Sequence, residues 1–322
     1  MSELLWQPSR ERINRSNMTR FMEFVNERME TGFSEYAELY EWSVRNIPDF
    51  WAAIWDFMDV IHSQGYDQVV DDPDKMPGAT WFSGARLNFA ENLLRYRDHE
   101  LAIIFWGEAS QPRHLTFSQL YSEVARVAAS MRDMGIQPGD RVVGYMPNVP
   151  ETVIAMLAAS SLGAVWSSCS PDFGIQGVLD RFGQIQPRLL FTIDGYSFKG
   201  KHLDVRSRLG KILEEIPSVE RVVMIPFLES DPDISSVPKA EHYEDFCTDN
   251  PGEIEFTQLP FEHPQYIMYS SGTTGKPKCM VHGAGGVLIN HLKELALHTD
   301  LGRRDRLFYF TTCGWMMWNW LV

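Results

Sequence analysis

Apolar residues in the middle of the chain follow two periodicities, one typical of helices and one typical of buried strands. Between 117 and 134, apolar residues recur every three or four positions, which predicts a helix. Thr116 and Gln119 fit a capping box at its start, and Gly135 is expected to end it. Short apolar runs predict buried strands at 141–146, 164–169, 189–193 and 221–225.

Helical segments separate these strands, at about 150–163, 177–185 and 202–215. Strands that alternate with helices pair in parallel through crossover connections, so we expect an α/β fold with a mainly parallel sheet flanked by helices. Residues 227–262 are acidic and rich in proline, and predict an irregular connection. After them we expect a strand at 265–271, a Gly-rich loop, a helix at about 284–297 and a strand at 306–311.

The first 95 residues differ from the rest, because they are rich in Trp, Tyr and Phe and favour helices. Ser34 is expected to cap one of these helices, and Pro48 is expected to interrupt the pattern. We therefore divide the chain into a helical region at 1–95 and a partial α/β domain at 96–322. The chain stops on an uncharged apolar run at 318–322, which predicts that it is the N-terminal part of a longer protein.

Charge and cysteine content narrow the classes of function. Lysine and arginine number 29 against 43 acidic residues, so the net charge is −14, which argues against a nucleic-acid surface. The N-terminus carries no signal-peptide pattern. No cysteine pair has C-x-x-C spacing, so we expect no zinc site, no disulfide framework and a cytoplasmic location. The cysteines are Cys169, Cys247, Cys279 and Cys313.

One uncharged stretch, at 152–170, is long enough to be weighed as a membrane span. It contains five serines and Gly163, and Pro171 follows it directly. These residues favour a buried helix that ends at Gly163 and a buried strand after it. We therefore expect no membrane span.

A loop after the strand at 265–271 gives the clearest prediction of chemistry. Its string SSGTTGKPK spans 270–278. Gly272 and Gly275 permit close backbone approach and positive φ, and the backbone N–H groups of such a loop can form an anion nest. Lys276 and Lys278 add charge-assisted contacts. The predicted phosphate-binding residues are Ser270, Ser271, Gly272, Thr273, Thr274, Gly275, Lys276 and Lys278.

The spacing of this loop excludes a Walker loop. That motif has four residues between its glycines and ends in Gly-Lys-Ser/Thr, whereas here two residues separate the glycines. Pro277 follows Lys276 and resists a helix that starts there. A kinase or GTPase is thereby disfavoured. Two alternatives stay open, a surface turn with two solvated lysines and a non-catalytic module that only binds a phosphate.

The string SSGTTGKPK resembles the signature loop of the adenylate-forming enzymes, which include acyl-CoA synthetases, luciferases and nonribosomal peptide adenylation domains. Residues 36–95, including Trp81-Phe82, are similar to the N-terminal region of acetyl-CoA synthetase relatives. The resemblance covers almost the whole chain and implies the large N-terminal domain of the adenylate-forming fold. It also implies that the nucleoside site, the hinge and the small C-terminal domain with the catalytic lysine lie beyond Val322.

The resemblance implies an acid–thiol ligase that works in two half-reactions. A carboxylate attacks the α-phosphate of ATP to give acyl-AMP and pyrophosphate, and the thiol of coenzyme A then attacks the acyl carbon. Residues 270–278 would hold the leaving phosphates together with Mg²⁺. ATP, Mg²⁺ and coenzyme A are thus the expected cofactors, and small molecules are the expected partners.

By the same resemblance, the acyl pocket is walled by Gly314, Trp315, Met316, Met317 and Trp318. Two Trp and two Met side chains form an adaptable apolar slot. Acetyl-CoA synthetases carry smaller residues after this Gly-Trp pair, so we expect a short acid other than acetate, namely acetoacetate. Its ketone would need one hydrogen-bond donor in the pocket. Trp315, Trp318 and Asn319 can each supply it. The alternative activity is a ligase for acetate, propionate or another short acid. The alternative role of these residues is the end of a core strand.

Residues Lys199, Gly200, Lys201 and His202 are the expected contacts to coenzyme A. In acetyl-CoA synthetases an Arg-Gly-Gly-Arg stretch in this region contacts the phosphates of coenzyme A. The match is partial, because lysine is a point charge and lacks the bidentate fork of arginine. A solvated basic turn is the alternative.

Overall fold

The computed structural model describes residues 5–108, 111–270 and 275–322, and it forms two compact units. The first, which we call the helical unit, extends to Arg86 and includes Pro260–Glu262 and Gly285–Leu307. The second, the sheet unit, contains Leu87–Leu259, His263–Ala284 and Phe308–Val322. The expected boundary at residue 95 stays a prediction.

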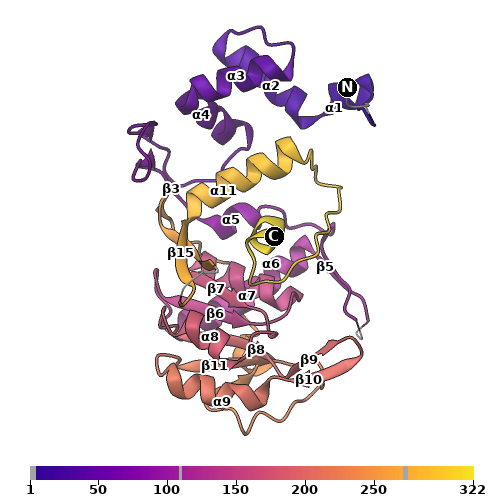
Figure 1. Cartoon of the computed structure of the whole chain (residues 1–322), viewed down its shortest axis with the longest axis vertical. Helices are drawn as coiled ribbons and strands as arrows, with labels where there is room; N and C mark the ends of the chain where they lie inside the picture. Colours follow the sequence, from indigo (N-terminus) through magenta and orange to yellow (C-terminus); the bar gives the residue numbers. More distant parts are fainter. Residues whose placement is uncertain (1–4, 109–110, 271–274) are drawn as a thin grey trace. The chain divides into compact units, whose positions relative to one another are not determined.

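Aromatic side chains form the core of the helical unit. The rings of Trp55 and Phe82 stack with centroids 4.9 Å apart, and Phe82 lies 4.7 Å from Phe261. Its helices, drawn in Figure 1, are α1 (Arg10–Arg15), α2 (Asn17–Met29), α3 (Tyr36–Arg45), α4 (Ile47–Phe57), α11 (Ala284–Lys293) and a π-helical turn, Glu294–His298. Strands β1 (Gln68–Val70) and β2 (Trp81–Ser83) form a short antiparallel pair.

The start of α3 differs from the prediction. Glu35, rather than Ser34, is the N-cap, and it forms a capping box with Glu38. Ser34 instead donates its backbone N–H to the Glu38 carboxylate at 2.7 Å. Pro48 lies in the first turn of α4, where a backbone N–H would have no partner within the helix, so proline is tolerated there. The break between α3 and α4 therefore comes just before Pro48.

A seven-stranded sheet forms the centre of the sheet unit, in the order β12-β11-β8-β6-β7-β14-β15. Neighbouring strands from β12 to β14 are parallel, and β15 is antiparallel to β14. The expected α/β class and mainly parallel sheet are thus confirmed. The strands are β6 (Arg141–Tyr145), β7 (Val165–Cys169), β8 (Leu189–Ile193), β11 (Arg221–Ile225), β12 (Ala240–His242), β14 (Pro264–Ser270) and β15 (Lys278–Gly283).

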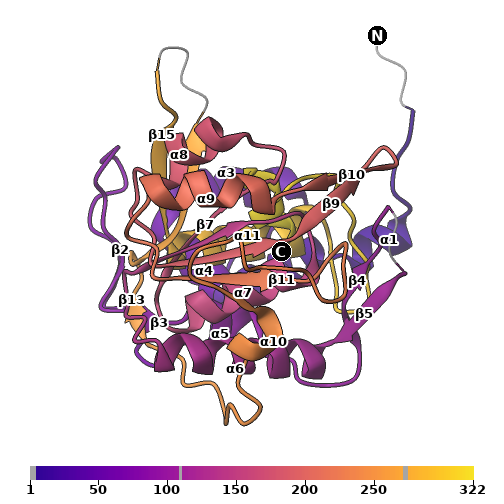
Figure 2. The same cartoon turned by 90° about the horizontal axis from the view of Figure 1, so that it is seen from below.

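Helices cover both faces of this sheet. Figure 2 shows α8 and α9 along one face and α6 and α7 along the other. The helices are α5 (Phe89–Leu93), α6 (Phe117–Asp133), α7 (Pro150–Ser161), α8 (Ile175–Phe182), α9 (Arg206–Glu215), α10 (Tyr243–Phe246) and α12 (Met316–Leu321). The remaining strands are β3 (Arg86–Leu87), which pairs with β13 (Leu259–Pro260), and two hairpins, β4 (Leu101–Phe105) with β5 (Arg113–Thr116) and β9 (Gly195–Phe198) with β10 (Lys201–Asp204).

The helix predicted from periodicity is confirmed as α6. Thr116 Oγ1 accepts the Gln119 N–H at 3.2 Å, and Gln119 Oε1 accepts the Thr116 N–H at 2.9 Å. The helix ends at Asp133, and Gly135 follows with a φ of 79°. Its apolar stripe, Leu120, Val124, Val127 and Met131, is buried.

The uncharged stretch at 152–170 is a buried helix followed by a buried strand, as expected. All five residues of β7 are buried, and α7 is buried along nearly its whole length. Gly163 separates the two elements with a φ of 77°. Within the described ranges, no helix combines the length and the apolar character that crossing a membrane requires.

Several predicted boundaries were wrong, and each error concerns the presence or absence of a strand. The helix expected at 202–215 begins only at Arg206, because Lys201–Asp204 pairs with Gly195–Phe198 as strand β10. Residues 278–283 form strand β15, which we did not predict. Residues 306–311, all described, form no strand. A strand is defined by its hydrogen-bonded neighbour, which local sequence does not specify.

Asn88 connects three segments inside the sheet unit. Its side-chain oxygen accepts the Glu91 N–H and caps α5, and the residue is 1% exposed. Its side-chain nitrogen lies 3.1 Å from the carbonyl oxygens of both Ser160 and Ser161, and 2.9 Å from that of Thr257. Asn88 therefore donates hydrogen bonds to carbonyl groups at the C-terminal end of α7 and holds the loop that contains Thr257 beside it.

We expect Asn88→Ala to lower the free energy of unfolding by about 2–4 kcal/mol, since it removes a helix cap and leaves buried carbonyls unpaired. Urea denaturation followed by circular dichroism measures this change. Asn250→Ala, at an exposed loop position, is the matched control and should change stability by less than about 0.5 kcal/mol. A loss at Asn88 no larger than that of the control would show that these hydrogen bonds do not stabilise the unit.

Candidate functional site

The carboxyl ends of the parallel strands β6, β7 and β14 meet at one edge of the sheet. These ends are Tyr145, Cys169 and Ser270. Ligands of open α/β sheets bind outside this edge. The loop predicted to hold phosphate leaves β14 at Ser270, so the fold places it at the edge where binding sites form.

The described part of this loop agrees with the sequence analysis. Gly275 has a φ of 108°, which confirms the positive φ expected there. Lys276 and Lys278 are exposed, so an anion in solvent can reach them. After Pro277 the chain enters strand β15 rather than a helix, so the Walker geometry is absent, as predicted. The remaining predicted contacts, Ser271, Gly272, Thr273 and Thr274, lie outside the described residues.

Strands β14 and β15 hold the two ends of the loop together. Ser270 pairs directly with Lys278 in the antiparallel ladder. Gln184, just after α8, donates its side-chain N–H to the carbonyl oxygen of Pro277 at 2.9 Å. The guanidinium of Arg181 lies 5.7 Å from the ring of Tyr269. The loop is therefore fixed at both ends by ordered elements, while its lysines face solvent.

The segment at 312–321 also lies at this edge. Ser168 donates its hydroxyl to the carbonyl oxygen of Cys313 at 2.6 Å. The Cys313 thiol donates to the carbonyl oxygen of Met146 at 2.9 Å. These two bonds attach the segment to the ends of β7 and β6. The loop predicted to bind phosphate and the predicted acyl residues thus lie at the same edge of the sheet.

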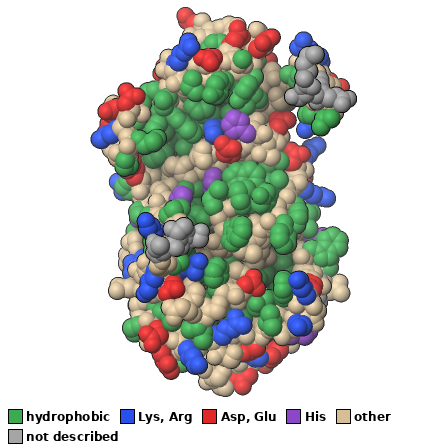
Figure 3. All heavy atoms as spheres, in the orientation of Figure 1, with side chains coloured by type: hydrophobic (Ala, Val, Ile, Leu, Met, Phe, Trp, Pro, Cys, Tyr) green, Lys and Arg blue, Asp and Glu red, His purple; other side chains and the backbone are tan. Residues whose placement is uncertain are grey.

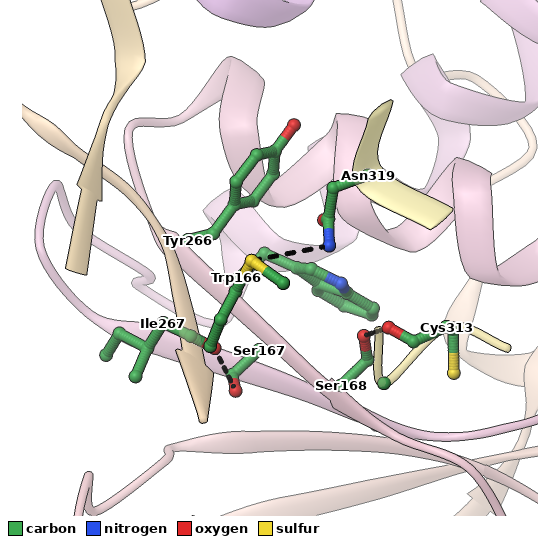
Figure 4. Close-up of a pocket in the computed structure, with 9 residues that line it drawn as sticks. Trp166, Ser167, Ser168, Tyr266, Ile267, Cys313 and Asn319 are labelled. Atoms are coloured by element: carbon green, nitrogen blue, oxygen red, sulfur yellow. Dashed lines mark hydrogen bonds between the residues drawn. The ribbon is translucent and has the colours of Figure 1, made fainter. Parts of the chain in front are cut away.

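A small pocket lies where this segment packs on the sheet. Figure 4 shows side chains from β7, β14 and the end of the chain converging on it. Its lining residues are Trp166, Ser167, Ser168, Tyr266, Ile267, Met268, Cys313, Gly314 and Asn319.

Two buried polar groups in this pocket have no hydrogen-bond partner among the described residues, the Trp166 indole N–H and the Tyr266 hydroxyl. Burial raises the pKa of Tyr266, so this hydroxyl remains protonated. Sequence reasoning missed both residues, because each lies in an apolar run that predicts only a strand.

The structure divides the predicted acyl residues into a buried and an exposed set. Trp318 is fully buried, and its indole N–H donates to Asn148 Oδ1 at 2.8 Å. Trp315 is 65% exposed and Met316 is 50% exposed. Met317 is half-buried, and Gly314 lines the pocket. The segment thus uses Trp318 for packing and presents Trp315 and Met316 outward.

Hydrophobic side chains remain exposed just before these residues. Phe308 is 83% exposed and Phe310 is 90% exposed. Figure 3 shows hydrophobic side chains gathered on the face that it displays, which is the face where Figure 1 draws the yellow C-terminal segment. Such exposed apolar surface is unusual unless it contacts another molecule or segment.

The residues predicted to contact coenzyme A form the tip of the β9–β10 hairpin. Lys199 and Gly200 are the two turn residues, and Lys201 and His202 begin β10. The Ser197 hydroxyl lies 3.2 Å from His202 Nδ1 across the hairpin. These four residues are brought together as one basic tip.

One cysteine lies directly after the loop that is predicted to bind phosphate. Cys279 follows Lys278 in β15 and is exposed, whereas the other cysteines are buried. Burial raises the pKa of Cys247 and of Cys313 to about 12, and it raises that of Cys169 as well. Burial also raises the pKa of Cys279, although its side chain reaches solvent. Solvent exposure therefore distinguishes the thiol of Cys279 from the other three.

We expect iodoacetamide to modify Cys279 at least about a hundredfold faster than the three buried cysteines, because the thiolate is the reactive form and must be accessible. Since its pKa is raised, the rate should still increase with pH above the usual range of a free thiol. Peptide mass spectrometry after timed labelling measures the four rates. Labelling in urea, where all four should react alike, is the control, and faster reaction of a buried cysteine in the native chain would contradict the arrangement described.

No group of three or more His, Cys, Asp or Glu side chains that could hold a metal ion is found among the residues that the structure describes.

Comparison with known proteins gives two family matches. Residues 89–321 match the family model described as AMP-binding enzyme, and residues 36–93 match the acetyl-coenzyme A synthetase N-terminus. The chain is 45% identical to acetoacetyl-CoA synthetase from Danio rerio, over 100% of this chain and 49% of that protein. It is 47% identical to acetoacetyl-coenzyme A synthetase from Rhizobium meliloti, over 99% of this chain and 49% of that protein.

Two further relatives extend the comparison. Malonamoyl-CoA synthetase from Penicillium aethiopicum is 41% identical over 99% of this chain and 46% of that protein. The solved structure of acetoacetyl-CoA synthetase from Streptomyces lividans superposes with a TM-score of 0.94 at 43% identity, over 99% of this chain and 49% of that chain. This likeness confirms the expected fold, and the chain spans about half the length of these relatives. Since the AMP-binding model matches most of its residues, the chain belongs to the family of AMP-binding enzymes.

Proposed function

We propose that the full-length protein carrying this chain joins acetoacetate to coenzyme A, using ATP and an acyl-AMP intermediate. The observation that carries this proposal is the position of the SSGTTGKPK loop. It leaves β14 at the carboxyl edge of the sheet, where the segment with Gly314 and Trp315 is also bound. Similarity to acetoacetyl-CoA synthetases along the whole chain supports the choice of acid.

In the first half-reaction, the acid carboxylate attacks the α-phosphate of ATP and pyrophosphate leaves. Both reactants are anions, so the site must offset negative charge and align the attack. We assign the leaving phosphates to the predicted loop residues, with Lys276 and Lys278 as the cations. Mg²⁺, bound mainly through phosphate oxygens and water, would neutralise further charge at this position.

We assign the acid to the segment after the loop, where Trp315, Met316 and Met317 form an adaptable apolar wall. In the second half-reaction, the thiol of coenzyme A attacks the acyl carbon and AMP leaves. We assign the phosphates of coenzyme A to the basic tip of the β9–β10 hairpin. Small molecules are thus the proposed partners, and the net charge of −14 speaks against nucleic acid.

We also propose that the region at 1–95 is an N-terminal segment like that of acetyl-CoA synthetases and that 96–322 is part of the AMP-binding domain. A cytoplasmic location is supported by the four cysteines, none of which forms a disulfide.

The test is acetoacetate-dependent exchange of pyrophosphate into ATP, followed by formation of the thioester when coenzyme A is added. Acetate, propionate and malonamate are the competing acids, the last because a relative is named malonamoyl-CoA synthetase. If one of these acids supports faster exchange than acetoacetate, the proposed substrate is wrong but the proposed reaction type stands. Phosphate binding without exchange for any acid would favour a non-catalytic module.

A further inference from the structure

The turn of the β9–β10 hairpin holds a carboxylate from another part of the sheet unit. The backbone N–H of Lys199 donates to Glu108 Oε2 at 3.1 Å, and the N–H of Gly200 donates to Glu108 Oε1 at 2.9 Å. Glu108 follows β4, on the connection to β5. Each carboxylate oxygen is thus bound by one of two consecutive backbone amides.

The backbone of this turn explains why both N–H groups point the same way. Phe198 pairs with Lys201, which leaves Lys199 and Gly200 as a two-residue turn. Their φ angles are 51° and 73°, so both lie in the left-handed region. Successive N–H groups in turns of this kind form concave anion sites. Gly200 adopts this conformation without strain, because it has no side chain.

The charges around the turn favour an anion with more charge than one carboxylate. Lys199 and Lys201 lie on either side of Gly200, and His202 follows. Glu108 is exposed, so its attraction to the turn is weakened by water and salt. A phosphate offers the same pair of oxygen acceptors with about twice the charge and a third oxygen for a lysine.

We propose that Glu108 occupies this turn in the free protein and is displaced by the coenzyme A phosphate assigned to the hairpin above. The identity of the ligand rests on the function proposed above, whereas the occupied nest does not. Glu108 then acts as an internal competitor. A site that is open only part of the time has an apparent affinity equal to its intrinsic affinity multiplied by the open fraction. It also keeps weakly binding anions out of the hairpin turn.

The test is titration of the ¹⁵N-labelled chain with coenzyme A, following the amide signals of Lys199 and Gly200. In the unaltered chain, both signals should shift with the ligand. In Glu108→Gln, which keeps the size and one acceptor oxygen but removes the charge, the apparent dissociation constant should fall about threefold to tenfold. Glu100→Gln is the matched control, since it removes one exposed negative charge at the other end of β4 and should leave binding unchanged.

Three results would overturn the proposal: no movement of the two amide signals, unchanged or weaker binding in Glu108→Gln, or an equal gain in Glu100→Gln. Weaker binding would mean that Glu108 supports the hairpin instead of competing. Titration with 3′-dephospho-coenzyme A and inorganic phosphate identifies which phosphate binds. Exchange of pyrophosphate into ATP needs no coenzyme A, so the two experiments are independent. Absence of exchange would reject the proposed function, but it would not contradict anion binding at the turn that these titrations detect.

Discussion

Replacing Lys276 by alanine is expected to slow acyl-AMP formation about tenfold to a hundredfold, with little change in stability. Lys276 is exposed on the loop at the carboxyl edge of the sheet, and surface substitutions of this kind rarely change the free energy of unfolding. A lost charge-assisted contact to phosphate costs about 1.5–3 kcal/mol, which corresponds to this change in rate. The measurement is acetoacetate-dependent exchange of pyrophosphate into ATP, made on a full-length enzyme that carries this chain.

Lys211→Ala is the matched control for this experiment. Lys211 is an exposed lysine on α9, outside the loop, so its removal changes the net charge equally and should leave exchange unaltered. Thr273→Ala combined with Thr274→Ala should slow exchange by a similar factor, since two predicted donors are lost. Full exchange activity in Lys276→Ala would mean that the loop does not bind the leaving phosphates.

Acetoacetate is expected to exceed butyrate in kcat/KM by a factor of up to about 10⁴. The two acids have similar lengths, but only acetoacetate carries a ketone in the middle of the chain. A site that donates a hydrogen bond to the ketone leaves that donor unpaired when butyrate binds. An apolar pocket that measured only length would separate acids by roughly 10–200-fold per methylene. The measurement is kcat/KM for acetoacetate, butyrate, propionate and acetate, again with the full-length enzyme.

The structure narrows the choice of ketone donor. The Trp318 indole N–H is bound to Asn148, and the side-chain nitrogen of Asn319 lies 3.3 Å from the carbonyl oxygen of Trp315. Both groups therefore support α12. Of the three donors expected from the sequence, the indole of Trp315 is the one that is mainly exposed, at 65% for the residue.

Trp315→Phe should therefore reduce the preference for acetoacetate over butyrate about tenfold or more, since it removes one donor and keeps an aromatic ring. Trp318→Phe is the contrasting variant. It should lower stability by about 1 kcal/mol through loss of the bond to Asn148, and the preference should persist. If butyrate matches acetoacetate in the unaltered enzyme, no ketone donor exists and the substrate assignment fails.

Local sequence determined the elements whose stability is local. Helix α6 has its own cap, its own apolar stripe and its own glycine stop, so periodicity predicted it from Thr116 to Gly135. The buried strands β6, β7, β8 and β11 were found from continuous apolar runs, because a strand covered on both faces needs apolar side chains on both. The loop at 270–278 was found from its composition and spacing.

Tertiary structure decided how strands pair and which segments come into contact. Residues 278–283 became a strand because β14 offers a free edge, and 201–204 became a strand because they fold back on β9. The order of strands placed Ser270 beside the ends of β6 and β7, and it buried Trp318 while exposing Trp315. The contact of Glu108 with the turn at Lys199 joins residues 91 positions apart. Sequence specifies which groups can donate and accept, but the chain must fold before a donor has a neighbour.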